Sequence, residues 1–164
     1  SPPMILSKSC DHAIRATLYV AMHPDRGYVP IREIAAGLGI SFHFLTKILQ
    51  VLTQKNIMTS FKGPNGGIAL ARPAEEIALK EIVLAIDGEG LFRGCMVGLD
   101  HCDDDHPCPL HEQWSALRGD LDELFSRTSV AHLAGRARAE GLRLTDLLPG
   151  ELTKQNAGPD SSRR

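Results

Sequence analysis

The chain has 164 residues, 43% of them hydrophobic, and a formal net charge of −2 at pH 7. This hydrophobic content suffices for one folded core and excludes a wholly disordered chain. The sequence contains neither an apolar run long enough to span a bilayer nor the apolar segment of a signal peptide, so we expect a soluble, cytoplasmic protein that does not associate with membranes.

Four helices are predicted in the first half of the chain from apolar side chains at helical spacing and from capping residues at the helix ends. The second and third are separated only by a tight turn at Gly39, because glycine adopts the left-handed conformation easily. Together they form a helix-turn-helix. The expected boundaries are a first helix capped by Ser7 or Ser9 and ending before Pro24, a second at 31–38, a third from Ser41 to about Lys55 and a fourth from about Leu79 to Ile86.

Two short segments, 57–61 and 68–72, flank the glycine-rich stretch KGPNGG, and this pattern predicts a β-hairpin. A hairpin after a helix-turn-helix is a wing. In such proteins the second helix of the motif enters the major groove of double-stranded DNA, and the wing contacts the backbone or the minor groove. The predicted DNA-binding residues are Ser41, Phe42, His43, Thr46, Lys47, Gln50, Lys62, Gly63, Asn65 and Gly66.

The distribution of charge also favours DNA binding. From Ile34 to Ala74 the sequence contains no Asp or Glu, so this segment is purely basic. A winged helix used only for protein contacts is the alternative, and the absence of acids argues against it. If its four cations all met phosphate in both subunits of a dimer, log affinity would fall with log salt at a slope of about −7. The four cations are Lys47, Lys55, Lys62 and Arg72.

Residues 95–111 read CMVGLDHCDDDHPCPLH and contain three of the four cysteines of the chain. In a reducing cytosol, clustered cysteines indicate metal binding or redox chemistry more often than disulfides. Thiolates bind iron–sulfur clusters or zinc, and both the 2Fe-2S and the 4Fe-4S cluster accept three cysteines and a further ligand. We define residues 92–108 as the cysteine loop. The predicted metal ligands are Cys95, Cys102, Cys108 and His111.

A structural zinc site is the alternative for this loop, because the spacing also comes close to that of CCCH zinc fingers. RNA-binding fingers of that kind need aromatic residues and positive charge. The segment from Cys95 to His111 has no aromatic residue and four aspartates, so we do not expect RNA to bind.

Pro109 suits the first turn of a last, long helix. Five large apolar residues in this helix repeat at alternating steps of four and three, the pattern of a coiled-coil seam. We therefore expect a homodimer through residues 109–127; the alternative is that the stripe packs on its own domain. The five residues are Leu110, Trp114, Leu117, Leu121 and Leu124.

The fold class expected from these elements is mainly α with a small β-wing, that is, a winged helix-turn-helix followed by a long C-terminal dimerisation helix. The expected organisation is a DNA-binding domain at 4–91, the cysteine loop at 92–108, the dimerisation helix and its end at 109–133, and a C-terminal tail at 134–164.

The run ISFHFLTKILQVLTQKNIMTSFKGPNGGIALARP resembles the DNA-binding core of the Rrf-two family of bacterial transcription regulators. ILSKSCDHAIRATLYVA and IALKEIVLAIDG resemble that family's first and fourth helices, so the similarity covers about residues 4–133. The resemblance implies an iron–sulfur regulator with the same three cysteines. Cys108-Pro109-Leu110-His111 matches the ligand spacing of IscR-like members. NsrR-like members instead take an aspartate from the first helix, which corresponds to Asp11, and the adjacent Cys10 is a further rival ligand.

These observations lead to the hypothesis of a homodimeric DNA-binding transcription regulator. Its iron–sulfur cluster would sense redox state, nitric oxide, iron or cluster supply. We expect no enzymatic activity, since the chain contains no Rossmann or P-loop glycine motif. The alternatives are a winged-helix regulator with a structural zinc ion and an iron–sulfur electron carrier, although in an electron carrier the basic wing would have no function.

Overall fold

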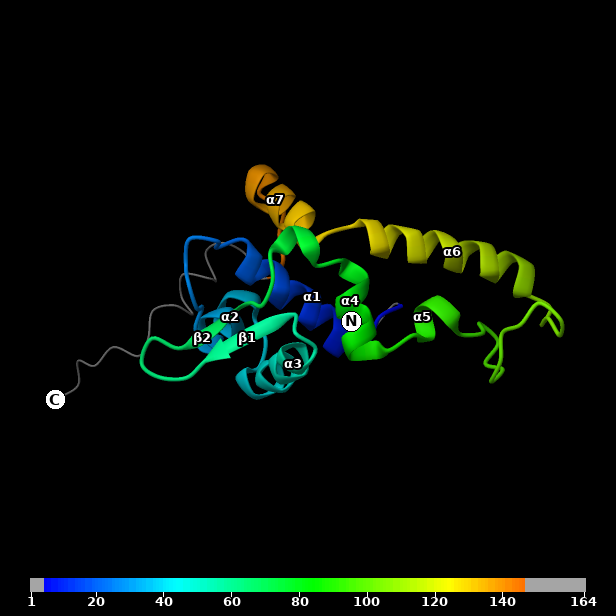
Figure 1. Cartoon of the computed structure of the whole chain (residues 1–164), viewed down its shortest axis with the longest axis horizontal. Helices are drawn as coiled ribbons and strands as arrows, with labels where there is room; N and C mark the ends of the chain where they lie inside the picture. The colour runs from blue at the N-terminus through cyan, green and yellow to red at the C-terminus, as the bar shows by residue number, and fades with distance from the viewer. Residues whose placement is uncertain (1–4, 147–164) are drawn as a thin grey trace.

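The structure, a computed structural model, describes residues 5–146. It is mainly helical with one two-stranded antiparallel sheet (Figure 1), which confirms the predicted fold class. In chain order the elements are α1 Lys8–Ala21, α2 Ile31–Leu38, α3 Phe42–Gln54, β1 Met58–Phe61, β2 Gly67–Leu70, the 3-10 turn η1 Ala74–Glu76, α4 Leu79–Asp87, α5 Gly90–Arg93, α6 His111–Arg127 and α7 Val130–Glu140.

The capping residues of the first three helices define the helix-turn-helix. The Ser7 side chain accepts a hydrogen bond from the N–H of Cys10 at 3.0 Å, so Ser7 is the N-cap of α1. Gly39 ends α2 with φ of 67°, a left-handed conformation that favours glycine. Ser41 then caps α3 through the N–H of Phe44. The axes of α2 and α3 meet at 117°, within the range typical of a helix-turn-helix.

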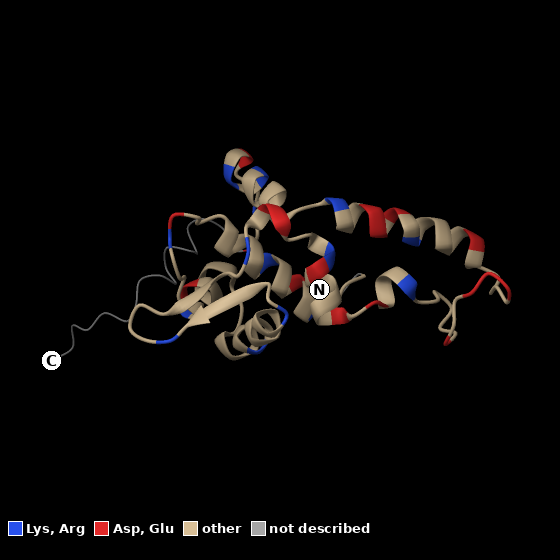
Figure 2. Cartoon of the chain, in the orientation of Figure 1, with Lys and Arg blue, Asp and Glu red and all other residues tan. Residues whose placement is uncertain are grey.

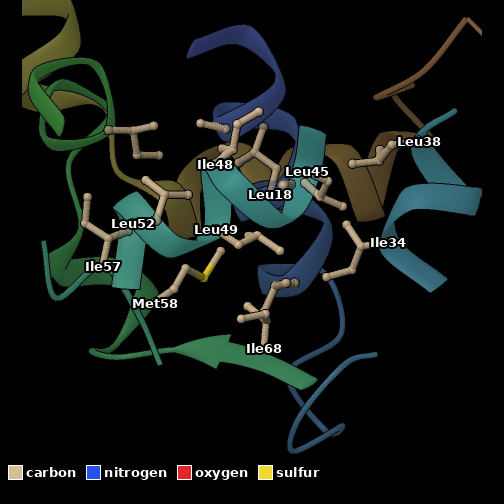
Figure 3. Close-up of a cluster of buried hydrophobic side chains, with 14 of the residues drawn as sticks. Leu18, Ile34, Leu38, Leu45, Ile48, Leu49, Leu52, Ile57, Met58 and Ile68 are labelled. Atoms are coloured by element: carbon tan, nitrogen blue, oxygen red, sulfur yellow. The ribbon is translucent and has the colours of Figure 1, made fainter. Parts of the chain in front are cut away.

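The buried face of α3 forms the centre of the core (Figure 3). Leu45, Ile48, Leu49 and Leu52 recur at helical spacing and are all buried. Burial of each such side chain contributes roughly 1.5–3 kcal/mol to folding. They pack against apolar side chains of α1, α2 and the hairpin, which fixes the opposite face of α3 toward solvent. The packing partners drawn in Figure 3 include Leu18, Ile34, Leu38, Ile57, Met58 and Ile68.

The predicted wing is an antiparallel hairpin in which Met58 pairs with Leu70 and Phe61 with Gly67. Its second strand is also bonded to the segment before α2, because the N–H and carbonyl of Val29 both bond to Ile68 at 2.8 Å. The two backbones approach so closely that a Cβ at Gly67 would lie 2.2 Å from the Val29 carbonyl oxygen. Gly67 therefore lets the wing dock against the helix-turn-helix.

Helix α6 extends away from the core, and the cysteine loop lies at its far end (Figure 1). None of its residues is buried. Side-chain contacts fasten it to α4 and α5. The Lys80 ammonium of α4 donates to Asp122 at 2.6 Å, and the rings of Phe92 and Phe125 meet edge to face with centroids 5.7 Å apart.

Two features differ from the sequence prediction. The short helix α5 was not predicted; it spans the end of the expected DNA-binding domain and the first two residues of the cysteine loop. The tail expected from residue 134 is helical as far as Glu140, because α7 is capped by Ser129 and buries Val130, Ala134 and Ala137. These three residues lie on one face of α7 at helical spacing, against α1 and η1. The rest of the predicted tail, beyond residue 146, lies outside the described residues.

Within residues 5–146, no single helix is both long and apolar enough to cross a membrane; the bent pair α2 and α3 meets the criterion only when the two are taken together, by length and composition.

Candidate nucleic-acid interface and candidate metal centre

The solvent-facing side of α3 carries the side chains that were predicted to read DNA. His43, Lys47 and Gln50 are exposed, whereas Phe42 and Thr46 are half-buried. The Thr46 hydroxyl donates to the Phe42 carbonyl at 2.8 Å, so its proton is used within the helix. Figure 2 shows α3 and the wing with basic but no acidic residues, while acidic residues gather on the cysteine loop and along α6. The exposed face of α3 is therefore suited to an anionic partner.

Arg32, which the sequence reasoning missed, also lies at this surface. Its guanidinium carbon is 4.6 Å from the centre of the Phe42 ring, at the start of α3. Such a cation–π contact is worth about 0.5–1 kcal/mol at an exposed site. Arg32 is exposed on the first turn of α2, and only the crossing of the two helices brings it beside the residues of α3. No local signal in the sequence shows this proximity.

The tip of the wing is a compact turn with an exposed cation. Lys62, Gly63 and Asn65 are exposed, and Gly63 has φ of +126°, which favours glycine. The N–H of Gly66 donates to the Gly63 carbonyl at 2.9 Å, so it closes the turn instead of facing outward. Lys62 and Asn65 are thus the polar side chains that the tip of the wing presents to a partner.

Arg72, counted above among the four cations of the basic segment, has a structural role. Its guanidinium donates to the Glu81 carboxylate at 2.5 Å and to the carbonyls of Asn56 and Glu76 at 3.2 Å each. These bonds join the end of α3 to the start of α4. Arg72 is therefore not a free cation of the basic segment, unlike what a count of charges in the sequence assumes.

The four predicted metal ligands lie at the far end of α6 as two contacting pairs. The sulfurs of Cys95 and Cys108 are 3.8 Å apart, and the Cys102 sulfur is 3.3 Å from Nδ1 of His111. All four side chains are partly exposed. Over residues 5–146 no three or more His, Cys, Asp or Glu side chains are grouped closely enough to hold one metal ion. The structure thus brings the predicted ligands into pairs, and a single four-ligand site stays a prediction.

His111 has the surroundings typical of a metal-binding histidine. Its Nδ1 faces Cys102, and its Nε2 is 2.7 Å from a carboxylate oxygen of Asp104. Ligand histidines commonly donate their second ring N–H to a carboxylate, which fixes the orientation of the ring. Asp104 could supply that acceptor.

The backbone around Cys95 favours a thiolate. Backbone N–H groups, chiefly that of Leu99 and also those of Val97 and Gly98, lower the pKa of the Cys95 thiol below its ordinary value. The neighbouring Cys108 side chain acts in the same direction. Because thiolates and not thiols ligate metals, this environment suits a metal ligand.

The family model for Rrf2, described as an iron-dependent transcriptional regulator, matches residues 6–136. The chain belongs to the Rrf2 family. Relatives include the HTH-type transcriptional regulator IscR of Photorhabdus laumondii, 30% identical over 142 residues that span 81% of this chain and 86% of that protein. IscR of Sodalis glossinidius is 30% identical over 130 residues, 79% of this chain and 78% of that protein.

Two solved structures share the fold. IscR of T. potens has a TM-score of 0.68 at 20% identity and covers 84% of this chain and 91% of its own. CymR, the global cysteine regulator of B. subtilis, has a TM-score of 0.67 at 19% identity, and the match covers 79% of this chain and 95% of its own. The predicted family and winged-helix fold are thereby confirmed. This Rrf2 protein is a DNA-binding transcription regulator and not an enzyme.

Asp11 and Cys10, the rivals of His111 as fourth ligand in this Rrf2 protein, lie on α1. Helix α1 is central in Figure 1, whereas the cysteine loop is at the far end of α6. Asp11 is 3.3 Å from both Arg15 and His12. Cys10 is fully buried beside Val83 and Phe92. Burial, reinforced by the charge of Asp87, raises the pKa of the Cys10 thiol to about 12. Within one chain, burial and the raised pKa disfavour Cys10 as a thiolate ligand.

A thiol-alkylation experiment tests this difference. At pH 8, metal-free, reduced protein is expected to react quickly at Cys95, Cys102 and Cys108 and slowly at Cys10, which stays protonated and buried. Mass spectrometry after a short exposure to iodoacetamide should find three modified cysteines, and unfolded protein should show four. Early modification of Cys10 in the folded protein would contradict the described burial.

Proposed function

We propose that this Rrf2 protein is a homodimeric regulator whose affinity for DNA is controlled by an iron–sulfur cluster at the cysteine loop. The cluster would report redox state, nitric oxide, iron or cluster supply. The observation that carries the proposal is the pairing of three thiols and an imidazole at the start of α6. Cluster binding would explain why the cysteine loop carries soft donor atoms, and control of DNA binding would explain why it lies beside the extended helix α6.

Cys95, Cys102, Cys108 and His111 are the residues that would hold the cluster. Their donor atoms fit it, since three thiolates and one imidazole are within the range of known cluster ligands. A bound cluster supplies a redox-active group that reacts with oxidants and gases. The description of the family as iron-dependent favours iron over zinc. Asp11 stays a rival fourth ligand, which a second copy of the chain would have to provide.

The proposed DNA-facing surface is assigned from the exposure and charge of its side chains. His43, Gln50 and Thr46 of α3, the proposed recognition helix, would contact base edges, and Lys47 would contact phosphate. Ser41 and Phe42 form the N-terminal end of that helix, where backbone N–H groups also attract phosphate. In the wing, Lys62 and Asn65 face outward beside Gly63 and Gly66. Arg32, held over Phe42, adds a phosphate contact from α2.

The salt dependence of DNA binding tests this surface. Arg72 is bonded internally, and Lys55 lies at the C-terminal end of α3, opposite the end that begins at Phe42. We therefore assign three phosphate contacts per protomer, from Arg32, Lys47 and Lys62. Six contacts per dimer correspond to a slope of about −5 for log affinity against log salt. Fluorescence anisotropy with a specific duplex at several salt concentrations measures it. Arg32→Gln should make the slope flatter by about 2, and Arg72→Gln should leave it unchanged; the reverse pattern would contradict the assignment.

Homodimerisation is proposed from the exposed apolar stripe of α6. Leu110, Leu117 and Leu124 are 38%, 53% and 58% exposed. They follow one another at a spacing of seven residues, so they form one line along the helix. A second α6 with the same stripe would cover these side chains, which the rest of residues 5–146 leaves open to water.

The contacts of α6 suggest how the cysteine loop influences DNA binding. The loop connects α5 to α6, and the indole N–H of Trp114 donates to the Gly94 carbonyl at 2.8 Å. Lys80–Asp122 connects α6 with the DNA-binding domain, and Phe92–Phe125 connects α6 with α5, whose Phe92 packs against Cys10 and Val83 of that domain. Ligation at the loop would fix the start of α6. It would thereby set the separation of two recognition helices, which must match half-sites one or two DNA turns apart.

Comparing metal-loaded with metal-free protein tests the proposal. A specific duplex is first selected from a random library with protein purified without oxygen. We expect iron and acid-labile sulfide in that protein and a different affinity for the duplex after the metal is removed. Equal affinity of the two forms for every selected duplex would refute cluster control. Colourless protein with stoichiometric zinc would instead support the structural zinc site.

A further inference from the structure

Arg118 joins the two donor pairs of the candidate metal centre. Its Nη1 donates to the Cys102 sulfur at 3.1 Å and to the Gly94 carbonyl at 3.0 Å. Cys102 belongs to one pair, and Gly94 directly precedes Cys95 of the other. One guanidinium nitrogen thus contacts one proposed ligand and the backbone that carries another.

The Gly94 carbonyl is itself held in place. It accepts a second hydrogen bond from Trp114, one helical turn before Arg118 on the same face of α6. Gly94 ends α5 in close contact with the preceding turn, and a Cβ there would lie 2.5 Å from the Gly90 carbonyl oxygen. The N–H of Gly94 also donates to the Gly90 carbonyl at 2.8 Å, and this bond fixes Gly94 at the end of α5. Arg118 therefore acts from a fixed position.

The charge of Arg118 stands out against an acidic loop that carries Asp100, Asp103, Asp104 and Asp105. Hydrogen bonds from a charged donor are about twice as strong as those between neutral groups. Hydrogen bonds to the sulfurs of a cluster, together with net charge, set its reduction potential. Arg93 is the cation closest to Cys95 along the chain, but its side chain is 76% exposed and pairs with Glu89 at 3.8 Å. Among residues 5–146, Arg118 is the cation that donates a hydrogen bond to a proposed ligand.

We propose that Arg118 is a positioning residue for the cluster. It holds Cys102 toward His111, ties this pair to the segment that carries Cys95, and raises the reduction potential through its N–H···S bond. The proposal rests on the proposed function, because it assigns Arg118 a role at the same site. The proposal also assigns different roles to two faces of α6. Trp114 and Arg118 bind the loop on one side, and Leu117 and Leu124 are exposed on the other.

The experiment compares Arg118→Gln and Arg118→Lys with wild-type protein and with Arg93→Gln. The Arg93 variant removes the same charge within the cysteine loop without removing a hydrogen bond to sulfur. All are purified without oxygen. Spectroelectrochemical titration gives the reduction potential, the loss of visible absorbance to an iron chelator gives the rate of cluster release, and circular dichroism reports folding.

For Arg118→Gln we expect cluster release about 10-fold faster, by analogy with the loss of other outer partners of metal ligands. We also expect the reduction equilibrium to shift about 10-fold toward the oxidised form, or about 59 mV for one electron. Arg118→Lys keeps the charge and should be intermediate, while Arg93→Gln should match wild type. If Arg118→Gln does not fold, the potential of Arg118→Lys decides.

The outcomes separate the two proposals. Wild-type protein that contains neither iron nor sulfide would overturn both the proposed function and the role of Arg118. A cluster in wild type with an unchanged potential in both Arg118 variants would overturn only the role of Arg118, even if cluster release were faster. An equal shift in Arg93→Gln would also overturn it, since general charge and not the bond to sulfur would then be responsible.

Discussion

Cys102→Ala is expected to yield folded protein that retains almost no iron or sulfide after purification without oxygen. Cys102 contacts both His111 and Arg118, so its removal breaks the pair that reaches α6. Removal of an outer partner of a metal ligand typically lowers metal affinity 10- to 100-fold, and removal of a direct ligand should lower it further. Iron and sulfide per chain, together with the visible absorption spectrum, measure the effect.

Variants at the rival positions identify the fourth ligand. Cys10→Ala is the matched control, because it removes the one cysteine outside the loop and should retain the cluster. In His111→Ala, the cluster should be lost faster to a chelator or its visible absorption spectrum should change. Asp11→Ala should behave like wild type. A full complement of iron and sulfide in Cys102→Ala would rule out the proposed ligand set. Loss in Asp11→Ala but not in His111→Ala would replace His111 with Asp11.

The sequence predicts the helix-turn-helix and wing well because local chemistry determines them. Ser7 and Ser41 cap helices whose apolar residues recur at helical spacing, and Gly39 is suited to the turn between α2 and α3. Helix α7 was missed for the opposite reason. It buries Ala134 and Ala137, two small residues, against a surface made by distant segments, so the pattern is weak until those segments are in place.

For the candidate site, sequence spacing identifies the donor atoms but not their neighbours. The pairing of Cys102 with His111 and the contact from Arg118 depend on the course of the cysteine loop, which has no regular repeat. The same holds at the DNA-facing surface. Arg72 counts as a free cation until tertiary contacts show it bonded to Glu81, and Arg32 gains its position only when α2 crosses α3.

Leu117→Glu is expected to convert a homodimer into monomers and to weaken binding to a two-half-site duplex by about 100-fold or more, since linked binding at two sites is lost. Leu117 is 53% exposed in the single chain, so the substitution should change the stability of the monomer by less than about 0.5 kcal/mol. In a dimer, the same carboxylate would be placed against the apolar stripe of a second α6. Analytical ultracentrifugation and duplex binding measure the two effects.

Leu142→Glu is the matched control, because Leu142 is 46% exposed but lies after α7, outside the stripe. It should remain dimeric and bind DNA like wild type. A dimer that persists in Leu117→Glu and in Leu124→Glu would show that α6 is not the interface. Control of DNA binding through the start of α6 would then need another connection, because the cysteine loop could no longer set the distance between two recognition helices. Monomers that keep full affinity for a two-half-site duplex would contradict that coupling just as directly.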